Sequence, residues 1–145
     1  MRKYLLFLAL GTFVLTGCGE KTLTCTNSET SDEYSIDEEI VLKFDKDGEK
    51  IKSGSFAAEF KVSEDYIERI DELIEYTETS FEDLKEKGID YKIQEKNDGF
   101  SLTLNYNTKN LTEEQIDELY FSGMYFEDGY NTVKTDYEEQ GYTCK

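Results

Sequence analysis

Two short turn signals, each ending in Asp-Gly, constrain the fold of this chain more than any other feature. The first is Asp45-Lys46-Asp47-Gly48 and the second is Asn97-Asp98-Gly99. Each lies between two segments in which apolar and polar residues alternate, which is the pattern of a half-buried β-strand. Asp-Gly tolerates the positive φ angles that tight hairpins require. The sequence therefore predicts two antiparallel hairpins.

The strands of the first hairpin follow from the alternation. The segment 34–44 has apolar residues at its even positions except at Glu38, for which a strand edge or a bulge is the simplest explanation. The return strand runs from about residue 51 to 62, with a bulge at Ser53-Gly54. Upstream, Leu23 and Cys25 lie on one side of a short strand-like segment at 22–26. We expect this segment to add an N-terminal strand to the sheet.

Helical periodicity occupies the remaining segments. Ser63 is expected to cap a helix that ends at Gly88. Thr112 and Gln115 form a capping box at the start of a second helix. A short third helix is expected near residues 132–140. The order predicts an α+β fold with an antiparallel sheet of about five strands (two hairpins plus an N-terminal strand) and helices packed on one face.

The first 18 residues resemble the signal of a bacterial lipoprotein. Arg2 and Lys3 are followed by an apolar run at 4–14 and by Leu15-Thr16-Gly17-Cys18, which is similar to a lipobox. In proteins with such a box, the cysteine receives a diacylglyceryl group and the chain is cut before it. A transmembrane anchor is the alternative, but the run is shorter than the roughly 20 residues that a spanning helix needs.

This resemblance implies a division of the chain into three parts. Residues 1–17 would be the signal peptide, Cys18 the lipidation site, 18–22 a short tether and 23–145 a single α+β domain. The protein would then lie on the extracytoplasmic face of the cell membrane and be held there by its lipid.

Charge limits the partners of the mature chain. Cleavage removes two cations and no acid, so the formal charge changes from −17 to −19. Nucleic-acid binding is disfavoured, because affinity there depends on Lys and Arg neutralising phosphates. The same sign argues against electrostatic docking on anionic lipid, so membrane attachment is expected to come from the lipid anchor.

Two further cysteines remain, Cys25 near the start of the domain and Cys144 one residue before the end of the chain. In an exported domain, such a pair favours a disulfide. Closing so long a loop would contribute at most roughly 4–5 kcal/mol by chain entropy. Two reduced cysteines are the alternative. A zinc site is weaker still, because the chain has no His to complete the ligand set.

The two ends of the domain suggest a family. Thr22-Leu23-Thr24-Cys25-Thr26 and Gly141-Tyr142-Thr143-Cys144-Lys145 stand behind the lipobox and around a hairpin–helix–hairpin–helix core. This layout resembles small bacterial lipoproteins of the YehR-like kind, which are themselves largely uncharacterised. The resemblance implies an extracytoplasmic α+β domain on a lipid anchor. It carries over Cys18, Cys25 and Cys144, and it brings no catalytic residue.

Catalytic chemistry finds little support in the sequence. The absence of His excludes imidazole-based triads and zinc-protease motifs. Adjacent acids are abundant, but a charge run is typical of a solvated face. Such groups of adjacent acids include Asp37/Glu38/Glu39, Asp71/Glu72, Glu82/Asp83, Asp117/Glu118 and Glu138/Glu139. We therefore expect no enzyme and no cofactor, with a carboxylate-based hydrolase as a distant alternative.

Calcium is a more natural partner for an exported acidic domain. The turn that begins at Asp45 lacks the ligand spacing of an EF-hand loop. Glu127, Asp128 and Asn131 around Gly129 could form a loop site, although any polar connection contains such residues. A calcium-dependent acidic envelope protein is therefore the second hypothesis, and no metal ligand is assigned.

The segment 120–130 is the one compositional oddity of the domain. Its aromatic residues are Tyr120, Phe121, Tyr125, Phe126 and Tyr130. They could pack over the sheet as a lid, or they could form an exposed surface for a peptide, a glycan strand or a partner protein of the envelope. The first hypothesis is accordingly a membrane-anchored binding or interaction module whose ligand the sequence does not identify.

Overall fold

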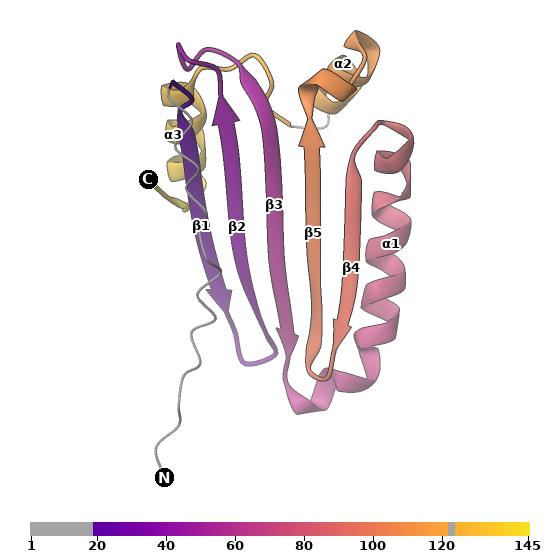
Figure 1. Ribbon diagram of the computed structural model, residues 1–145. Coiled ribbons are helices and arrows are strands. Elements are labelled where there is room, and N and C mark those ends of the chain that lie inside the picture. Colours follow the sequence, from indigo (N-terminus) through magenta and orange to yellow (C-terminus); the bar gives the residue numbers. More distant parts are fainter. Residues whose placement is uncertain (1–18, 122–123) are drawn as a thin grey trace.

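A six-stranded antiparallel sheet with three α-helices packed against it forms the fold (Figure 1), which confirms the predicted α+β class. The computed structural model describes residues 19–121 and 124–145. The strands are β1 (Thr22–Thr30), β2 (Tyr34–Phe44), β3 (Ile51–Val62), β4 (Asp90–Lys96), β5 (Gly99–Asn107) and β6 (Thr143–Cys144). The helices are α1 (Ile70–Glu86), α2 (Glu113–Phe121) and α3 (Tyr130–Glu139), with short 3-10 helices η1 (Glu64–Arg69) and η2 (Thr108–Asn110).

The strand order is β4-β5-β3-β2-β1-β6. Both predicted hairpins are present, β2–β3 and β4–β5. The bulge lies one residue before its predicted place, because Lys43 pairs with Ser53 while Phe44 pairs with Ile51, which leaves Lys52 as the extra residue. The sixth strand was not predicted. It is only two residues long and pairs with β1 at Cys25 and Thr26.

The helix boundaries follow the predictions with one correction. Ser63 stands at the N-cap of η1, but its side chain makes no capping hydrogen bond, and six residues of 3-10 helix precede α1. Gly88, with φ of +81°, ends the helix as expected. The capping box is confirmed, since Thr112 N donates to Gln115 Oε1 (2.9 Å) and Gln115 N donates to Thr112 Oγ1 (3.2 Å).

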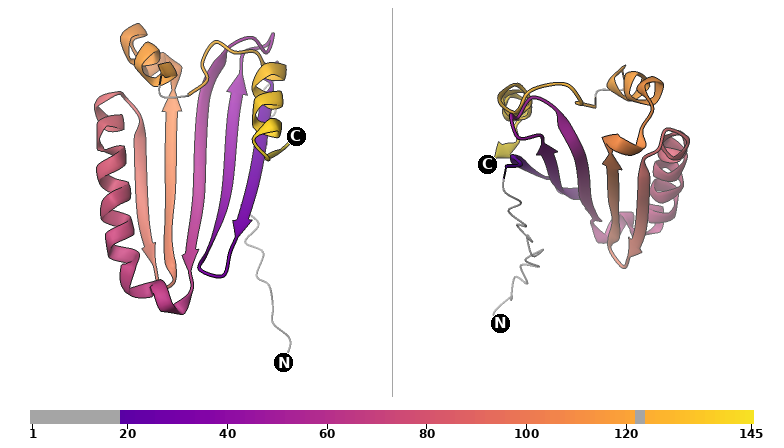
Figure 2. Two further views of the ribbon diagram at one scale, coloured as in Figure 1. Left: turned by 180° about the vertical axis from the view of Figure 1, so that it is seen from behind. Right: turned by 45° about the horizontal axis from the view of Figure 1, so that its top comes forward.

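All three α-helices lie on the same side of the sheet (Figure 2). α1 contacts β4 and β5 at one margin, whereas α3 contacts β1 and β6 at the other. The core accordingly has two clusters. One contains Leu23, Cys25, Ile40, Leu42, Phe44, Ile51 and Val133, and the other contains Ile89, Leu119 and Phe126. Alternation along the strands explains why the strand residues of these clusters share the helix side of the sheet.

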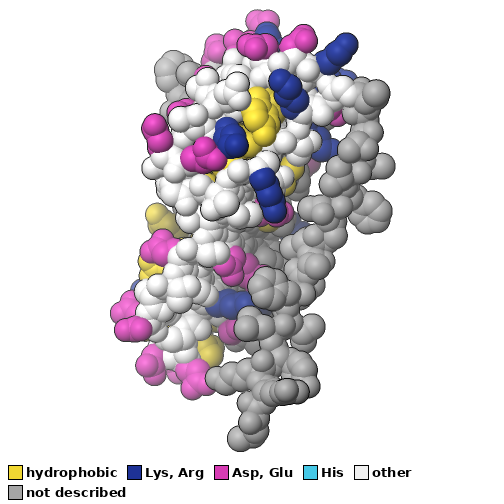
Figure 3. Space-filling view, turned by 90° about the vertical axis from the view of Figure 1, so that its left-hand side faces the viewer, with side chains coloured by type: hydrophobic (Ala, Val, Ile, Leu, Met, Phe, Trp, Pro, Cys, Tyr) yellow, Lys and Arg dark blue, Asp and Glu magenta, His cyan; other side chains and the backbone are white. Residues whose placement is uncertain are grey.

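Few large hydrophobic side chains of the described residues are exposed. Over the margin formed by α3 and β1, hydrophobic side chains show only as small separate areas among charged ones (Figure 3). The exposed large hydrophobic side chains of the described residues are Tyr34, Ile67, Leu73 and Tyr76. In the described part of the chain, no helix is long and apolar enough to cross a membrane.

Candidate functional site

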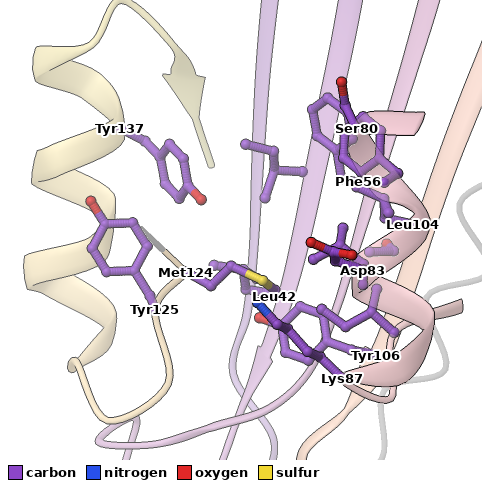
Figure 4. Close-up of a pocket in the computed structure, with 15 residues that line it drawn as sticks. Leu42, Phe56, Ser80, Asp83, Lys87, Leu104, Tyr106, Met124, Tyr125 and Tyr137 are labelled. Atoms are coloured by element: carbon purple, nitrogen blue, oxygen red, sulfur yellow. The ribbon is translucent and has the colours of Figure 1, made fainter. Parts of the chain in front are cut away.

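A groove of about 480 Å³ lies on the helix side of the sheet. Strands β2, β3 and β5 form its floor, α1 forms one wall, and the segment that leads into α3 forms the other with α3 itself. Figure 4 shows Ser80, Asp83 and Lys87 on the α1 side and Tyr125 and Tyr137 on the α3 side. The apolar and aromatic lining residues are Ile40, Leu42, Phe56, Phe81, Leu84, Ile89, Leu104, Tyr106, Met124, Tyr125 and Tyr137.

A close approach between two strands shapes the floor. Gly54 of β3 pairs with Tyr106 of β5, and a Cβ atom at Gly54 would overlap the Tyr106 ring. The absence of a side chain at Gly54 therefore lets this ring pack against the Gly54 backbone. The Tyr106 ring also contacts Phe126, with ring centroids 5.5 Å apart. Burial raises the pKa of the Tyr106 hydroxyl well above its usual value.

Three tyrosines stand in a row beside α3, and two of them, Tyr125 and Tyr137, line the groove. Tyr125 and Tyr137 meet edge to face with ring centroids 5.5 Å apart, and Tyr137 and Tyr142 do so at 5.3 Å. Such geometry is favoured for aromatic pairs. Burial raises the pKa of Tyr137 to about 12. Burial also raises the pKa of Tyr142, and its hydrogen bond to Glu38 raises it further.

Glu38 lies at the end of this row, and the explanation offered for it from sequence is wrong. It lies in regular register within β2, which is an interior strand, and not at an edge or a bulge. Tyr142 Oη donates to its Oε2 atom at 2.7 Å, and Asn27 Nδ2 lies 3.5 Å from the same atom. A charged residue on the inner face is thus balanced by hydrogen-bond donors from β1 and from the C-terminal segment.

The α1 wall carries the polar groups of the groove. Asp83 and Lys87 also line a second, adjoining pocket between α1 and α2. Lys87 Nζ lies 3.9 Å from Glu118 Oε2 of α2. The residues around this second pocket are Asp83, Glu86, Lys87, Glu114, Gln115 and Glu118. An apolar groove therefore continues directly into an acidic region.

The structure distributes the aromatic segment between core and groove. Tyr125 lines the groove together with Met124. Phe126 is 3% exposed and lies in the core, so it cannot contribute to an exposed surface. Tyr130 packs edge to face on Phe44 with ring centroids 5.4 Å apart. The side chains of Tyr120 and Phe121 lie outside the described residues, so their part in the predicted surface stays a prediction.

Two of the acids considered for calcium, Asp45 and Glu127, have other contacts. Asp45 Oδ1 accepts from the backbone N–H groups of Glu49 (2.9 Å) and Lys50 (3.4 Å), which hold the pKa of this carboxyl below its usual value. Glu127 pairs with Lys50 at 3.3 Å. Asp128 has one buried carboxylate oxygen without a hydrogen-bond partner. Within residues 19–121 and 124–145, no group of three acids or cysteines gathers around a point that could hold a metal ion.

The predicted disulfide is present. Cys25 and Cys144 face each other on the paired strands β1 and β6, with Cα atoms 4.1 Å apart, and the bridge spans 119 residues of sequence. Backbone hydrogen bonds between Thr24 and Lys145 (2.9 Å in both directions) flank it. Cys18, the predicted lipidation site, lies outside the described residues.

The fold and its groove define a small α+β protein with one antiparallel sheet that is covered incompletely on one face. No protein family matches the chain, and no curated protein matches it significantly. Among solved structures, it is similar to an NMR structure of a protein from Streptococcus pneumoniae TIGR4, with a TM-score of 0.53 and 13% sequence identity. That match covers 87% of this chain and 85% of the other. At such identity the likeness shows a shared fold alone.

Proposed function

We propose that this protein is a lipid-anchored binding module of the bacterial cell envelope, similar to the YehR-like lipoproteins, and that the groove between α1 and α3 is its ligand site. The groove is the single observation that carries the binding role. Its volume of about 480 Å³ is within the usual range for ligand sites. Its mostly apolar lining with a few polar groups along one wall is also typical of such sites.

The location rests on two separate features. The first 18 residues have the layout of a lipoprotein signal that ends at Cys18. The disulfide between Cys25 and Cys144 fits an oxidising compartment outside the cytoplasm. Lipid attached at Cys18 would stand only seven residues before the bridge, so the domain would begin within roughly 25 Å of the membrane surface.

Fatty-acid labelling tests the anchor. We expect the wild-type chain to incorporate a labelled fatty acid in growing bacteria and Cys18→Ser to lose both label and processing. A substituted chain that still carries label and runs at the mature size would contradict the proposed anchor.

Photolabelling tests the ligand site. An aliphatic diazirine should insert into groove residues such as Leu104, Tyr106 and Met124 of the purified full-length protein. Ser80→Trp places an indole on the exposed α1 wall and should reduce this labelling several-fold. Thr79→Trp is the matched control, because Thr79 and Ser80 are both exposed and both donate to the carbonyl four residues earlier (2.9 and 2.8 Å). Absence of labelling in the groove of the wild-type protein would contradict the binding role.

A further inference from the structure

The spacing of the helices leaves room on the sheet for one more. α1 packs on β4 and α3 packs on β1, and four strand-to-strand steps separate those strands. At about 4.8 Å per step the two helices lie on strands about 19 Å apart. Helices that pack side by side need only 8–10 Å between axes. This separation would accommodate one further helix between α1 and α3, which Figure 1 shows at opposite margins of the sheet.

The α1 wall is long enough to flank a helix of several turns. Leu73, Tyr76, Ser80, Asp83 and Lys87 follow one another at spacings of three and four, so they share one face of α1. At 1.5 Å per residue this face is about 21 Å long. Ser80, Asp83 and Lys87 line the groove, and the face continues beyond it in two apolar side chains, with Leu73 38% and Tyr76 74% exposed.

The floor is unsuited to the addition of an extended strand. Its strands β2, β3 and β5 each pair on both sides within the sheet, so their backbone N–H and C=O groups are already used. Strand addition needs a free sheet edge. A lipid acyl chain is also a poor occupant, because it would strip water from Ser80, Asp83 and Lys87 without offering them a partner.

The acidic residues at one end of the groove favour a ligand helix that carries positive charges. The α1–α2 end of the groove is bordered by Asp83, Glu86 and Glu114, and Lys87, the cation among the described residues there, already lies near Glu118. In the described part of the chain these acids do not converge on one point, so they are suited to a row of cations and not to a compact metal ion. The complement is a helix that carries Lys or Arg along one edge of its apolar face.

We propose that the groove binds an amphipathic basic helix of a partner peptide or protein, with its apolar face on β3 and β5 and its cations toward the α1–α2 end. This inference rests on the proposed function of the groove as a ligand site. The ligand completes the helical layer that covers the sheet.

Photo-crosslinking of defined peptides tests the inference. The probe is a 14-residue peptide of Leu and Lys with one helical apolar face and a benzophenone at its centre. The full-length protein is held in phosphatidylcholine nanodiscs, and crosslinks are mapped by mass spectrometry. One companion peptide replaces Lys by Glu, and the other keeps the Leu–Lys composition but scatters the leucines around the helix. We expect the first peptide alone to crosslink efficiently to the groove.

Two pairs of variants test whether the Leu–Lys peptide binds in the groove. Asp83→Lys should weaken binding of the Leu–Lys peptide about fivefold, since a favourable exposed charge pair becomes a repulsive one. Glu82→Lys makes the same charge change at an exposed α1 position outside the groove and should have little effect. Ser80→Trp should block crosslinking, whereas Thr79→Trp should not.

The possible failures are distinguishable. If the diazirine labels the groove but the Leu–Lys peptide does not crosslink there, the basic-helix inference is overturned while the ligand site stands. Equal crosslinking by the Leu–Glu peptide or by the scattered peptide would also overturn it. If neither the diazirine nor any peptide reaches the groove, the proposed function fails as well.

Discussion

Tyr142 and Glu38 join two parts of the chain that are 104 residues apart. The hydroxyl lies 2.7 Å from the carboxylate, and both groups are only partly exposed. A carboxylate on the inner face of a sheet needs such a donor, because an unpaired buried charge is costly. This contact therefore fixes the C-terminal segment against β2 as well as against β1.

Removing the Tyr142 hydroxyl tests how much its hydrogen bond to Glu38 contributes to stability. We expect Tyr142→Phe to lower the free energy of unfolding by about 1 kcal/mol, because Glu38 loses its shorter hydrogen bond. The matched control is Tyr76→Phe, since Tyr76 is 74% exposed and should change stability by less than about 0.5 kcal/mol. Urea denaturation of both variants gives the comparison. Equal stability of Tyr142→Phe and the wild-type protein would show that the carboxylate is satisfied without Tyr142.

The partly buried tyrosines predict a loss of stability at alkaline pH. Unfolded tyrosine loses its proton near pH 10, whereas the native pKa of Tyr137 is about 12. Between these values the native state holds more protons than the unfolded state, so the free energy of unfolding falls as pH rises. The slope reaches at most ~1.4 kcal/mol per pH unit for each such tyrosine. Absorbance at 295 nm should show a late titrating group, and a single step near pH 10 for all tyrosines would contradict this.

At the residue scale, the sequence identified unusual residues but not the residues that contact them. The alternation marked Glu38 as out of place, yet nothing nearby in the chain indicates that a tyrosine 104 positions later donates to it. Tyr125 was singled out because its segment is rich in aromatic residues, and the structure places it in the groove. The α1 residues Ser80, Asp83 and Lys87 were missed, because one polar side chain per turn of an exposed helix has no distinguishing signal in sequence.

At the element scale, local signals were the reliable ones. The capping box at Thr112 and the turn at Gly48 depend on residues within a few positions, so sequence predicts them well. β6 could not be predicted, because two residues carry no alternation and the strand forms by pairing with β1. The 3-10 start of the helix after Ser63 has no evident signal in its sequence.

At the scale of a single strand, a substitution at Gly54 is expected to have the largest effect on stability. Gly54→Ala introduces a Cβ that overlaps the Tyr106 ring, so either the ring or the strand must move. We expect a loss of about 1–3 kcal/mol in the free energy of unfolding, as for overpacked cores. Diazirine labelling should also shift within the groove, because Tyr106 forms part of its floor.

The neighbouring variant Ser53→Ala serves as the control for Gly54→Ala. Ser53 lies on the same strand and pairs with Asn107 at the end of β5, away from the Tyr106 ring. Its expected effect is within about 0.5 kcal/mol. If the two variants unfold at the same urea concentration, the close approach at Gly54 does not constrain the sheet.

At the scale of the whole molecule, the groove results from where each helix docks. Sequence predicted helices on one face, but it did not show that α1 would lie at one margin and α3 at the other. The gap between them depends on strand order, which brings β3 beside β5 and places β1 and β4 far apart. Periodicity within any one segment carries no information about that separation.

The disulfide is the whole-molecule prediction with the largest expected effect. Reduction should lower the free energy of unfolding by up to roughly 4–5 kcal/mol, because the bridge restrains a long loop of the unfolded chain. The double variant Cys25→Ala/Cys144→Ala should show the lower stability with or without reductant. Purified protein should have no reactive thiol at either position under denaturing, non-reducing alkylation. Quantitative alkylation of both cysteines would contradict the bridge in solution.

The bridge between the first strand and the last also turns the chain into a covalent ring. The residues before Cys25 and after Cys144 lie outside this ring. A protease that cuts one peptide bond anywhere between them, for example in the exposed turn at 31–33, opens the ring without releasing a fragment. Every nicked molecule therefore remains one piece, and the anchor proposed at Cys18 would continue to hold all of it.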